Sequence, residues 1–242
     1  MILQRLATSI RKQDWFTVVI ETLIVVLGVF IGLQVNNWNE ARRDRDQATA
    51  LLERLERDFQ EMRALAAGQN RRFYENTVKL DELLTRIEDE QDPVSDAEAG
   101  QLLNDAMFFA LPQTTPISFQ EMLSAGRLAL LGDTDLSVEL REYAETARTI
   151  EGGSNLIAAD YVVIVRELTP YFTIVRAPDE ISLQLVSDID SLNVAELREA
   201  PKGRALITQL YVSHANMQTL TAGQIASIDE VLEAIGASGE TP

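Results

Sequence analysis

The chain has 242 residues, of which 46% are hydrophobic and 24% are charged, as in an ordinary folded protein. Its 38 Asp and Glu outnumber its 21 Lys and Arg, and the resulting net charge of −17 makes a nucleic-acid partner unexpected. The absence of cysteine excludes disulfides and thiolate metal sites, and the single histidine, His214, argues against histidine-rich metal sites and Ser-His-Asp catalysis.

Residues 1–14 form a short basic, amphipathic lead-in, which we expect to be cytoplasmic, and residues 15–38 (WFTVVIETLIVVLGVFIGLQVNNW) form the main apolar stretch. Between residues 15 and 35 the only charged residue is Glu21. A helix of this length measures about 31 Å, enough to cross a hydrocarbon core of about 30 Å. Trp15 and Trp38 bracket the stretch, where tryptophan favours membrane interfaces. We expect a transmembrane helix with these two anchors.

A cleaved secretory signal peptide is the alternative for this stretch. Its apolar region would be shorter and would end at a small-x-small cleavage site. Here the run is long and closes on residues 34–37, QVNN, without such a site. The sequence therefore favours an uncleaved anchor.

One face of the predicted helix is polar or small. At 100° per residue, a single stripe contains Glu21, Gly28, Gly32, Asn36 and Asn39. Gly28 and Gly32 make a G-x-x-x-G step, which lets two helix backbones approach closely. We expect a helix–helix interface, formed with a second copy or with another membrane protein. In the alternative, Glu21 extends to the lipid headgroups and the glycines are ordinary membrane-helix glycines.

The stretch at residues 33–40, LQVNNWNE, preceded by the glutamate and an IVVLGVFIG core, resembles a family of uncharacterised bacterial single-span membrane proteins, domain of unknown function 6090. A second stretch, residues 119–145, is similar to the same family's pattern of a Ser-Gly turn, an apolar pair, an acidic cap and a helix. The resemblance implies a membrane location and a mostly helical body, and it implies no activity.

Lys and Arg are balanced on the two sides of the span, so the positive-inside rule gives little guidance on orientation. We expect a single-pass protein of the bacterial inner membrane with a cytoplasmic N-terminus and a periplasmic C-terminal domain. Residues 1–39 hold three of the basic and two of the acidic residues, so the remainder carries 18 basic and 36 acidic residues. That balance suits a solvated domain.

Residues 39–236 are patterned as helices. Apolar residues recur at spacings of four and three up to about residue 90, which predicts that the anchor continues as one long helix, and Gln69 and Asn76 occupy positions in this seam. An intermolecular coiled coil is the alternative to a bundle within one chain. Because further helical segments follow, we expect an all-α fold in which the long helix joins an antiparallel helical bundle.

Local signals divide the rest of this domain. Ser95 and Glu98 read as a capping box for a helix over residues 96–110, Ser118 as the cap of a helix ending at Ser124, and Asp133 or Asp135 as the next cap. The pair Gly152-Gly153 predicts a helix break. For residues 171–190 we expect a loop and a short helix, with a strand as the alternative. A closing helix over residues 202–235 places His214 on its apolar face, and residues 237–242 should be a disordered tail.

Nothing in the chain selects a catalytic residue, a cofactor-binding residue or a metal site, so we expect neither an enzyme nor a cofactor. The expected function is a structural or protein-interaction role, with the lipid bilayer and either a second copy or another membrane protein as partners. The alternative is a membrane-anchored ligand sensor that acts through a partner protein.

Overall fold

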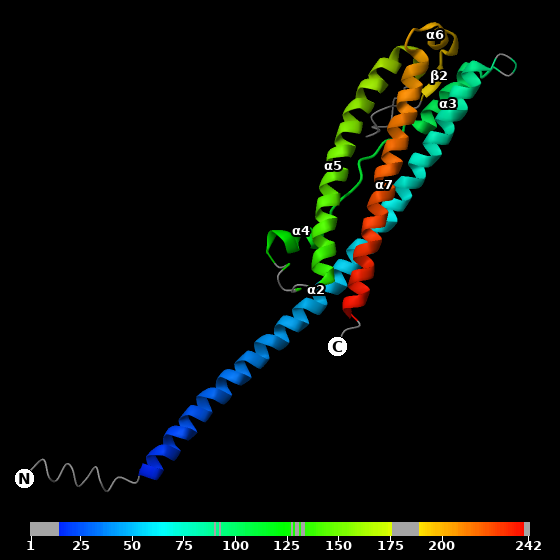
Figure 1. Ribbon diagram of the computed structural model, residues 1–242. Helices are drawn as coiled ribbons and strands as arrows, with labels where there is room; N and C mark the ends of the chain where they lie inside the picture. Colours follow the sequence, from blue (N-terminus) through cyan, green and yellow to red (C-terminus); the bar gives the residue numbers. More distant parts are fainter. Residues whose placement is uncertain are drawn as a thin grey trace, which may run out of the picture. The chain divides into compact units, whose positions relative to one another are not determined.

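The computed structural model describes residues 15–89, 91, 93–126, 128, 131, 134–175 and 189–239, and these are mostly helical (Figure 1). The predicted all-α class is confirmed at this level. The chain divides into two units, Met1–Leu51 and Leu52–Pro242, and the helix α2 (Trp15–Glu88) contributes residues to both. The predicted lead-in, residues 1–14, lies outside the described residues.

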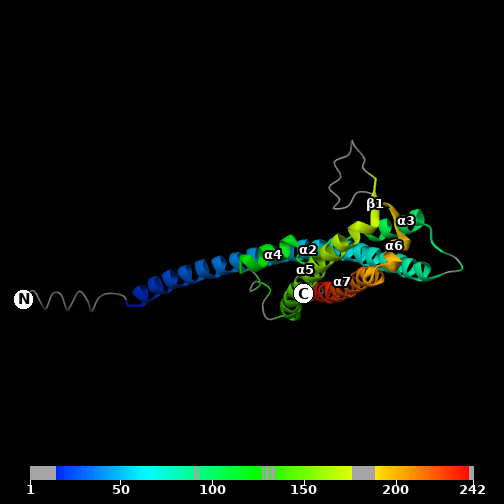
Figure 2. The same ribbon diagram turned by 90° about the horizontal axis from the view of Figure 1, so that it is seen from above.

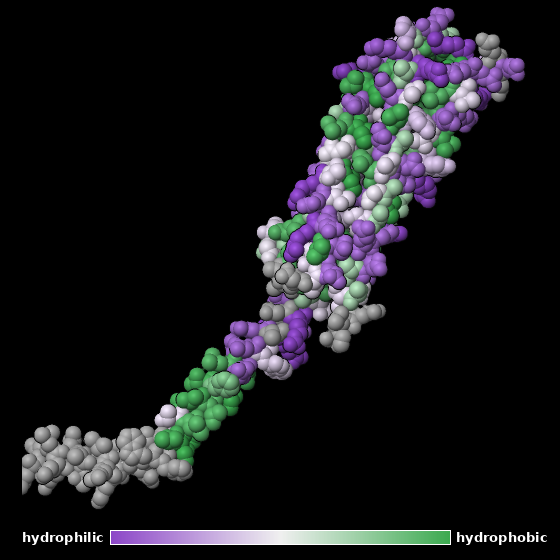
Figure 3. Space-filling model, viewed as in Figure 1, coloured by the Kyte–Doolittle hydropathy of each residue, from purple (hydrophilic) through white to green (hydrophobic). Residues whose placement is uncertain are grey.

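In the first unit, α2 carries apolar side chains on every side. All side chains from residue 19 to residue 40 are exposed, and the apolar ones form a green band near the lower left of Figure 3. Among the described residues this is the one helix that is long and apolar enough to cross a membrane, judged by length and composition. Where the sequence turns polar, contacts four residues apart support the helix, such as Asn36 Nδ2 donating to Glu40 Oε1 at 3.0 Å.

The second unit is built on three long helices: the part of α2 from Leu52 onward, α5 (Asp135–Leu168) and α7 (Gly203–Gly239). Figure 1 shows α2 and α5 running in the same direction and α7 running in the opposite one. The seam predicted for α2 is confirmed, because its apolar residues are buried at Leu55, Phe59, Met62, Ala66, Phe73, Leu80 and Ile87. This burial removes apolar area from water and stabilises a helix whose other side stays polar.

Since α2 and α5 run in the same direction, the chain has to return along the domain between them. It does so through α3 (Asp96–Ala106), an extended stretch at residues 107–116 and α4 (Ile117–Ser124) (Figure 1). We call residues 107–116 the return segment. The prediction that the helix begun at residue 96 continues to residue 110 is wrong, because α3 ends at Ala106 and the backbone beyond it is extended.

The helix caps were predicted in part. The Ser95 side chain accepts from the Glu98 N–H as expected, although the Glu98 carboxylate pairs with Arg86. Ser118 does not cap α4; its own N–H donates to Asp58 Oδ2 at 3.2 Å, so a carboxylate on α2 takes that role. The cap of α5 is Thr134, not Asp135, and Asp133 lies outside the described residues.

The pair Gly152-Gly153 does not break a helix, contrary to prediction, because α5 runs without interruption from Asp135 to Leu168. A Cβ atom added at Gly153 would lie 3.3 Å from Leu220 Cδ1 on α7. The glycine therefore allows close packing of α5 against α7. The packing outweighs a propensity cost of about 1 kcal/mol per glycine.

Two short strands lie at the two ends of residues 171–190, where a loop followed by a short helix was predicted and a strand was the alternative. β1 (Phe172–Ile174) pairs antiparallel with β2 (Ile189–Leu192), and residues 176–188 lie outside the described residues. A two-stranded ribbon is marginal alone. Here α3 packs directly on it: a Cβ at Gly100 would lie 2.6 Å from Ser191 Cα, and Asn104 Oδ1 accepts from the Ile189 N–H at 3.0 Å.

A short helix, α6 (Val194–Glu199), and a 3₁₀ turn at Thr169–Tyr171 complete this end of the domain. Figures 1 and 2 place α3, α6 and the strands at the same end of the long helices. They enclose a core cluster that includes Leu83, Leu103, Leu168, Leu192, Leu197 and Ile207. At the other end of the domain, α7 continues to Gly239. The prediction of a disordered tail over residues 237–242 is therefore wrong for residues 237–239, which are helical. Residues 240–242 lie outside the described residues.

Candidate functional site

The stripe predicted on the anchor lies along α2 in the first unit. Glu21, Gly28, Gly32, Asn36 and Asn39 all have exposed positions in this helix. A Cβ atom at Gly28 or Gly32 would meet no described atom within 4 Å, so the small stripe is open. Nothing in the described chain tests what covers it, and the interface stays a prediction.

Of the two predicted tryptophan anchors, the structure describes the side chain of Trp38 but not that of Trp15. Trp38 is 61% exposed, and the Arg42 guanidinium lies 5.9 Å from the centre of its ring. A large exposed indole beside a cation is suited to a membrane interface. Trp15 begins α2, and its side chain lies outside the described residues.

In the second unit, polar side chains converge on the return segment. Its carbonyl groups cannot pair with a neighbouring strand, and a buried carbonyl without a partner is costly. Side chains on the long helices supply the donors instead. The pairs are Tyr161 Oη to Met107 O (2.6 Å), Asn76 Nδ2 to Phe108 O (2.9 Å), Gln69 Nε2 to Leu111 O (3.3 Å), Gln224 Nε2 to Gln113 O (2.6 Å) and Tyr143 Oη to Thr114 O (2.6 Å).

His214 lies at the centre of this region, fully buried as predicted from its place on the apolar face. Three aromatic rings, those of Phe73, Phe109 and Tyr161, each have a centroid 5.8 Å from the imidazole centroid. The Asn76 amide nitrogen lies 3.5 Å from Nδ1. The expectation that a backbone group or carboxylate satisfies the ring is met only in part: the Ala106 backbone favours the charged ring, but Nε2 has no close hydrogen-bonding partner among the described residues.

Burial lowers the pKa of His214 to about 4, because the charged imidazolium would lose its hydration. The backbone of Ala106 opposes this shift only in part. Burial likewise raises the pKa of Tyr143 and of Tyr161 above the ordinary range. Both phenols therefore stay neutral donors to the return segment at physiological pH.

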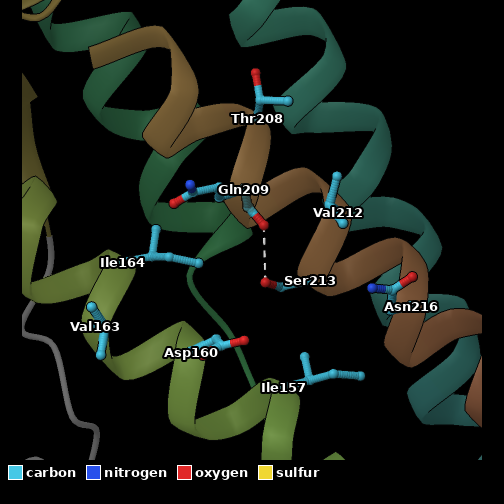
Figure 4. A pocket seen from close by; sticks show the side chains of 9 residues that line it. All are labelled: Ile157, Asp160, Val163, Ile164, Thr208, Gln209, Val212, Ser213 and Asn216. Atoms are coloured by element: carbon cyan, nitrogen blue, oxygen red, sulfur yellow. Dashed lines mark hydrogen bonds between the residues drawn. The ribbon is translucent and has the colours of Figure 1, made fainter. Parts of the chain in front are cut away.

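An open groove of about 450 Å³ lies between α5 and α7 (Figure 4). Its lining residues are Ile157, Asp160, Val163 and Ile164 on α5, with Thr208, Gln209, Val212, Ser213 and Asn216 on α7. In Figure 4, Asp160 lies between the helices, opposite Ser213. The Ser213 hydroxyl donates to the Gln209 carbonyl at 2.9 Å. Asp160 is the one charged side chain among the residues that line the groove.

Sequence reasoning did not find the groove, because the groove depends on which helices become neighbours. The polar residues that hold the return segment did leave a signal. Gln69 and Asn76 interrupt the apolar seam of α2, and a polar residue in a seam needs a buried partner. No group of three or more acidic or histidine side chains able to hold a metal ion occurs among the described residues.

In comparisons with known proteins, no family model, no curated protein and no solved structure matches this chain significantly.

Proposed function

We propose that this chain is a single-span protein of the bacterial inner membrane, anchored by residues 15–38, with a periplasmic helical bundle that has a structural or protein-interaction role. The observation that carries the proposal is the apolar stretch of α2, in which every side chain from residue 19 to residue 40 is exposed. In water such a surface would be strongly unfavourable, whereas in a bilayer it would face lipid. A helix also pairs its backbone groups internally, as lipid requires.

The proposal predicts where the full chain is found in a fractionated cell. We expect it to stay in the membrane pellet after alkaline carbonate washing. A variant with Val25→Arg and Val26→Arg should shift to the soluble fraction, because charged residues at the centre of a span oppose insertion. The matched control is Leu65→Arg with Val78→Arg, which adds the same charges at exposed positions in the later part of the same helix.

Retention of the Val25→Arg, Val26→Arg variant in the washed membrane would contradict the anchor. Protease access to the C-terminal domain in intact spheroplasts tests its side of the membrane. Digestion of the domain without lysis supports the periplasmic orientation, and protection supports the reverse.

The stripe of Glu21, Gly28, Gly32, Asn36 and Asn39 is proposed as the contact surface of the anchor. Gly28→Ile combined with Gly32→Ile should weaken self-association in bilayers by about tenfold, equivalent to roughly 1.4 kcal/mol, since the side chains would separate the backbones. The measurement is energy transfer between labelled copies in vesicles. Val26→Leu with Phe30→Leu, at the same spacing on the opposite face, is the control. If both variants associate like the unmodified chain, this face does not form the contact.

A further inference from the structure

The pair formed by α5 and α7 presents apolar side chains on its outer side. On α5, Leu156 is 72% exposed and Val163 is 40% exposed; on α7, Val212 is 46% exposed. Leu156, Asp160 and Val163 follow one another at spacings of four and three, so they share one face of α5. Another face of α5 is buried, at Ile150, Tyr161 and Leu168 among others.

The groove follows α5 for about two helical turns. Its α5 wall extends from Ile157 to Ile164, eight residues that span about 10 Å along the axis. Two packed helices present a trough into which the side-chain ridge of a third helix can fit. An amphipathic helix binds such a groove through anchors at positions i, i+3 or i+4, and i+7.

The charge in the groove indicates what kind of helix fits. Ion pairs between different elements of the domain use Glu88, Glu98, Asp105, Glu121 and Asp229. Asp160 forms no ion pair and no hydrogen bond with any residue of the described part of the chain. A cationic side chain would complement this carboxylate.

We propose that the groove between α5 and α7 binds an amphipathic helix of another protein, one with a Lys or Arg placed opposite Asp160. A second copy is a poorer occupant of the groove, because its domain carries 36 acidic against 18 basic residues and so offers few cationic side chains to face Asp160. This inference rests on the interaction role proposed above and supplies the chemistry of the partner.

The test is site-specific photocrosslinking of the full chain in its own cells. The photoreactive residue p-benzoylphenylalanine replaces Val163 in the groove, and the matched control replaces Val138, which lies on the same helix with 45% exposure and outside the groove. The expected result is an adduct with another protein from position 163 and not from position 138. Its crosslinked peptide should lie in an amphipathic helix that contains Lys or Arg.

Charge reversal tests the role of the carboxylate. Asp160→Lys should lower the yield of the adduct by about three- to fivefold, the upper part of the range for a solvent-exposed ion pair, and Glu151→Lys, at an exposed position of the same helix, should not. Three outcomes would overturn the proposal: equal labelling at positions 163 and 138, an adduct between two copies of this chain, or equal sensitivity to both charge reversals. The carbonate wash tests the membrane anchor independently of the crosslinking. The proposed groove and the proposed anchor can therefore each be contradicted without the other.

Discussion

Phe59→Ala should lower the free energy of unfolding by about 3–5 kcal/mol, the usual cost of emptying a fully buried phenylalanine site. The Phe59 side chain is 0% exposed. Its ring centroid lies 5.0 Å from that of Tyr143 on α5 and 5.9 Å from that of Phe119 on α4. One substitution therefore removes contacts between three helices.

The cavity would also disturb a hydrogen bond. Tyr143 packs edge-on against Phe59 and donates to the Thr114 carbonyl, which anchors the end of the return segment. If the tyrosine moves into the space left by Phe59, that partly buried carbonyl loses its donor, and the loss adds to the cavity cost.

Chemical denaturation of the full chain in mild detergent, followed by circular dichroism, measures this change. The control is Leu65→Ala on the same helix, where the side chain is 59% exposed and the expected change is below about 0.5 kcal/mol. Similar losses in the free energy of unfolding for both variants would mean that the face of α2 that carries Phe59 is not buried in solution.

The helices were predictable because their signal is local. Apolar spacing along α2 identified the buried face that includes Leu55, Phe59 and Phe73. The glycine pair in α5 gave a wrong prediction, because helix propensity depends only on neighbouring residues. The close approach of Gly153 to Leu220 joins residues far apart in the chain, and propensity does not contain it. Tertiary packing then decided the outcome.

The path of the chain between the helices was less predictable. The expected bundle alternates its helix directions, but α2 and α5 run in the same direction because the return segment carries the chain back. An extended stretch without a partner strand has no periodicity of its own. The sequence signal for the return segment is the set of buried side chains that donate to its carbonyl groups, among them Asn76 on α2 and Gln224 on α7.

The anchor stripe could be predicted from the sequence, whereas the groove between α5 and α7 could not. The anchor stripe lies on one helix, so residue spacing alone places Gly28 and Gly32 on one face. The groove combines Asp160 on α5 with Asn216 on α7, and only the packed structure brings these positions together. Interaction surfaces shared by two helices are therefore the part that a single sequence predicts least.

The free energy of unfolding should fall by about 3 kcal/mol as the pH is lowered from 7.5 to 4, because of His214 alone. In the folded protein the pKa of His214 is about 4, against 6.5 for an ordinary histidine. Between these values the unfolded chain binds a proton that the folded chain excludes. The contribution of neutral His214 is thus complete above about pH 6.5 and is lost as the pH falls toward 4.

Each pKa unit corresponds to about 1.4 kcal/mol, which gives the size of the effect. Carboxylates also contribute to acid destabilisation: Arg86 lowers the pKa of Glu98, and Arg63 lowers the pKa of Asp229. Their stabilisation is present above the ordinary carboxyl pKa and is lost as the pH falls through their lowered pKa values. His214→Gln removes only the histidine contribution, since the amide stays neutral throughout.

Denaturation curves at a series of pH values, for the unmodified chain and for His214→Gln, measure the difference. We expect it to change by about 3 kcal/mol between pH 7.5 and 4 and to be constant above pH 7.5. Because His214 is the only histidine, its Cε1–H resonance gives an independent titration in the folded state. A midpoint near 6.5 in that titration, or parallel stability curves for the two proteins, would show that water reaches the ring and that the aromatic enclosure of His214 is not closed.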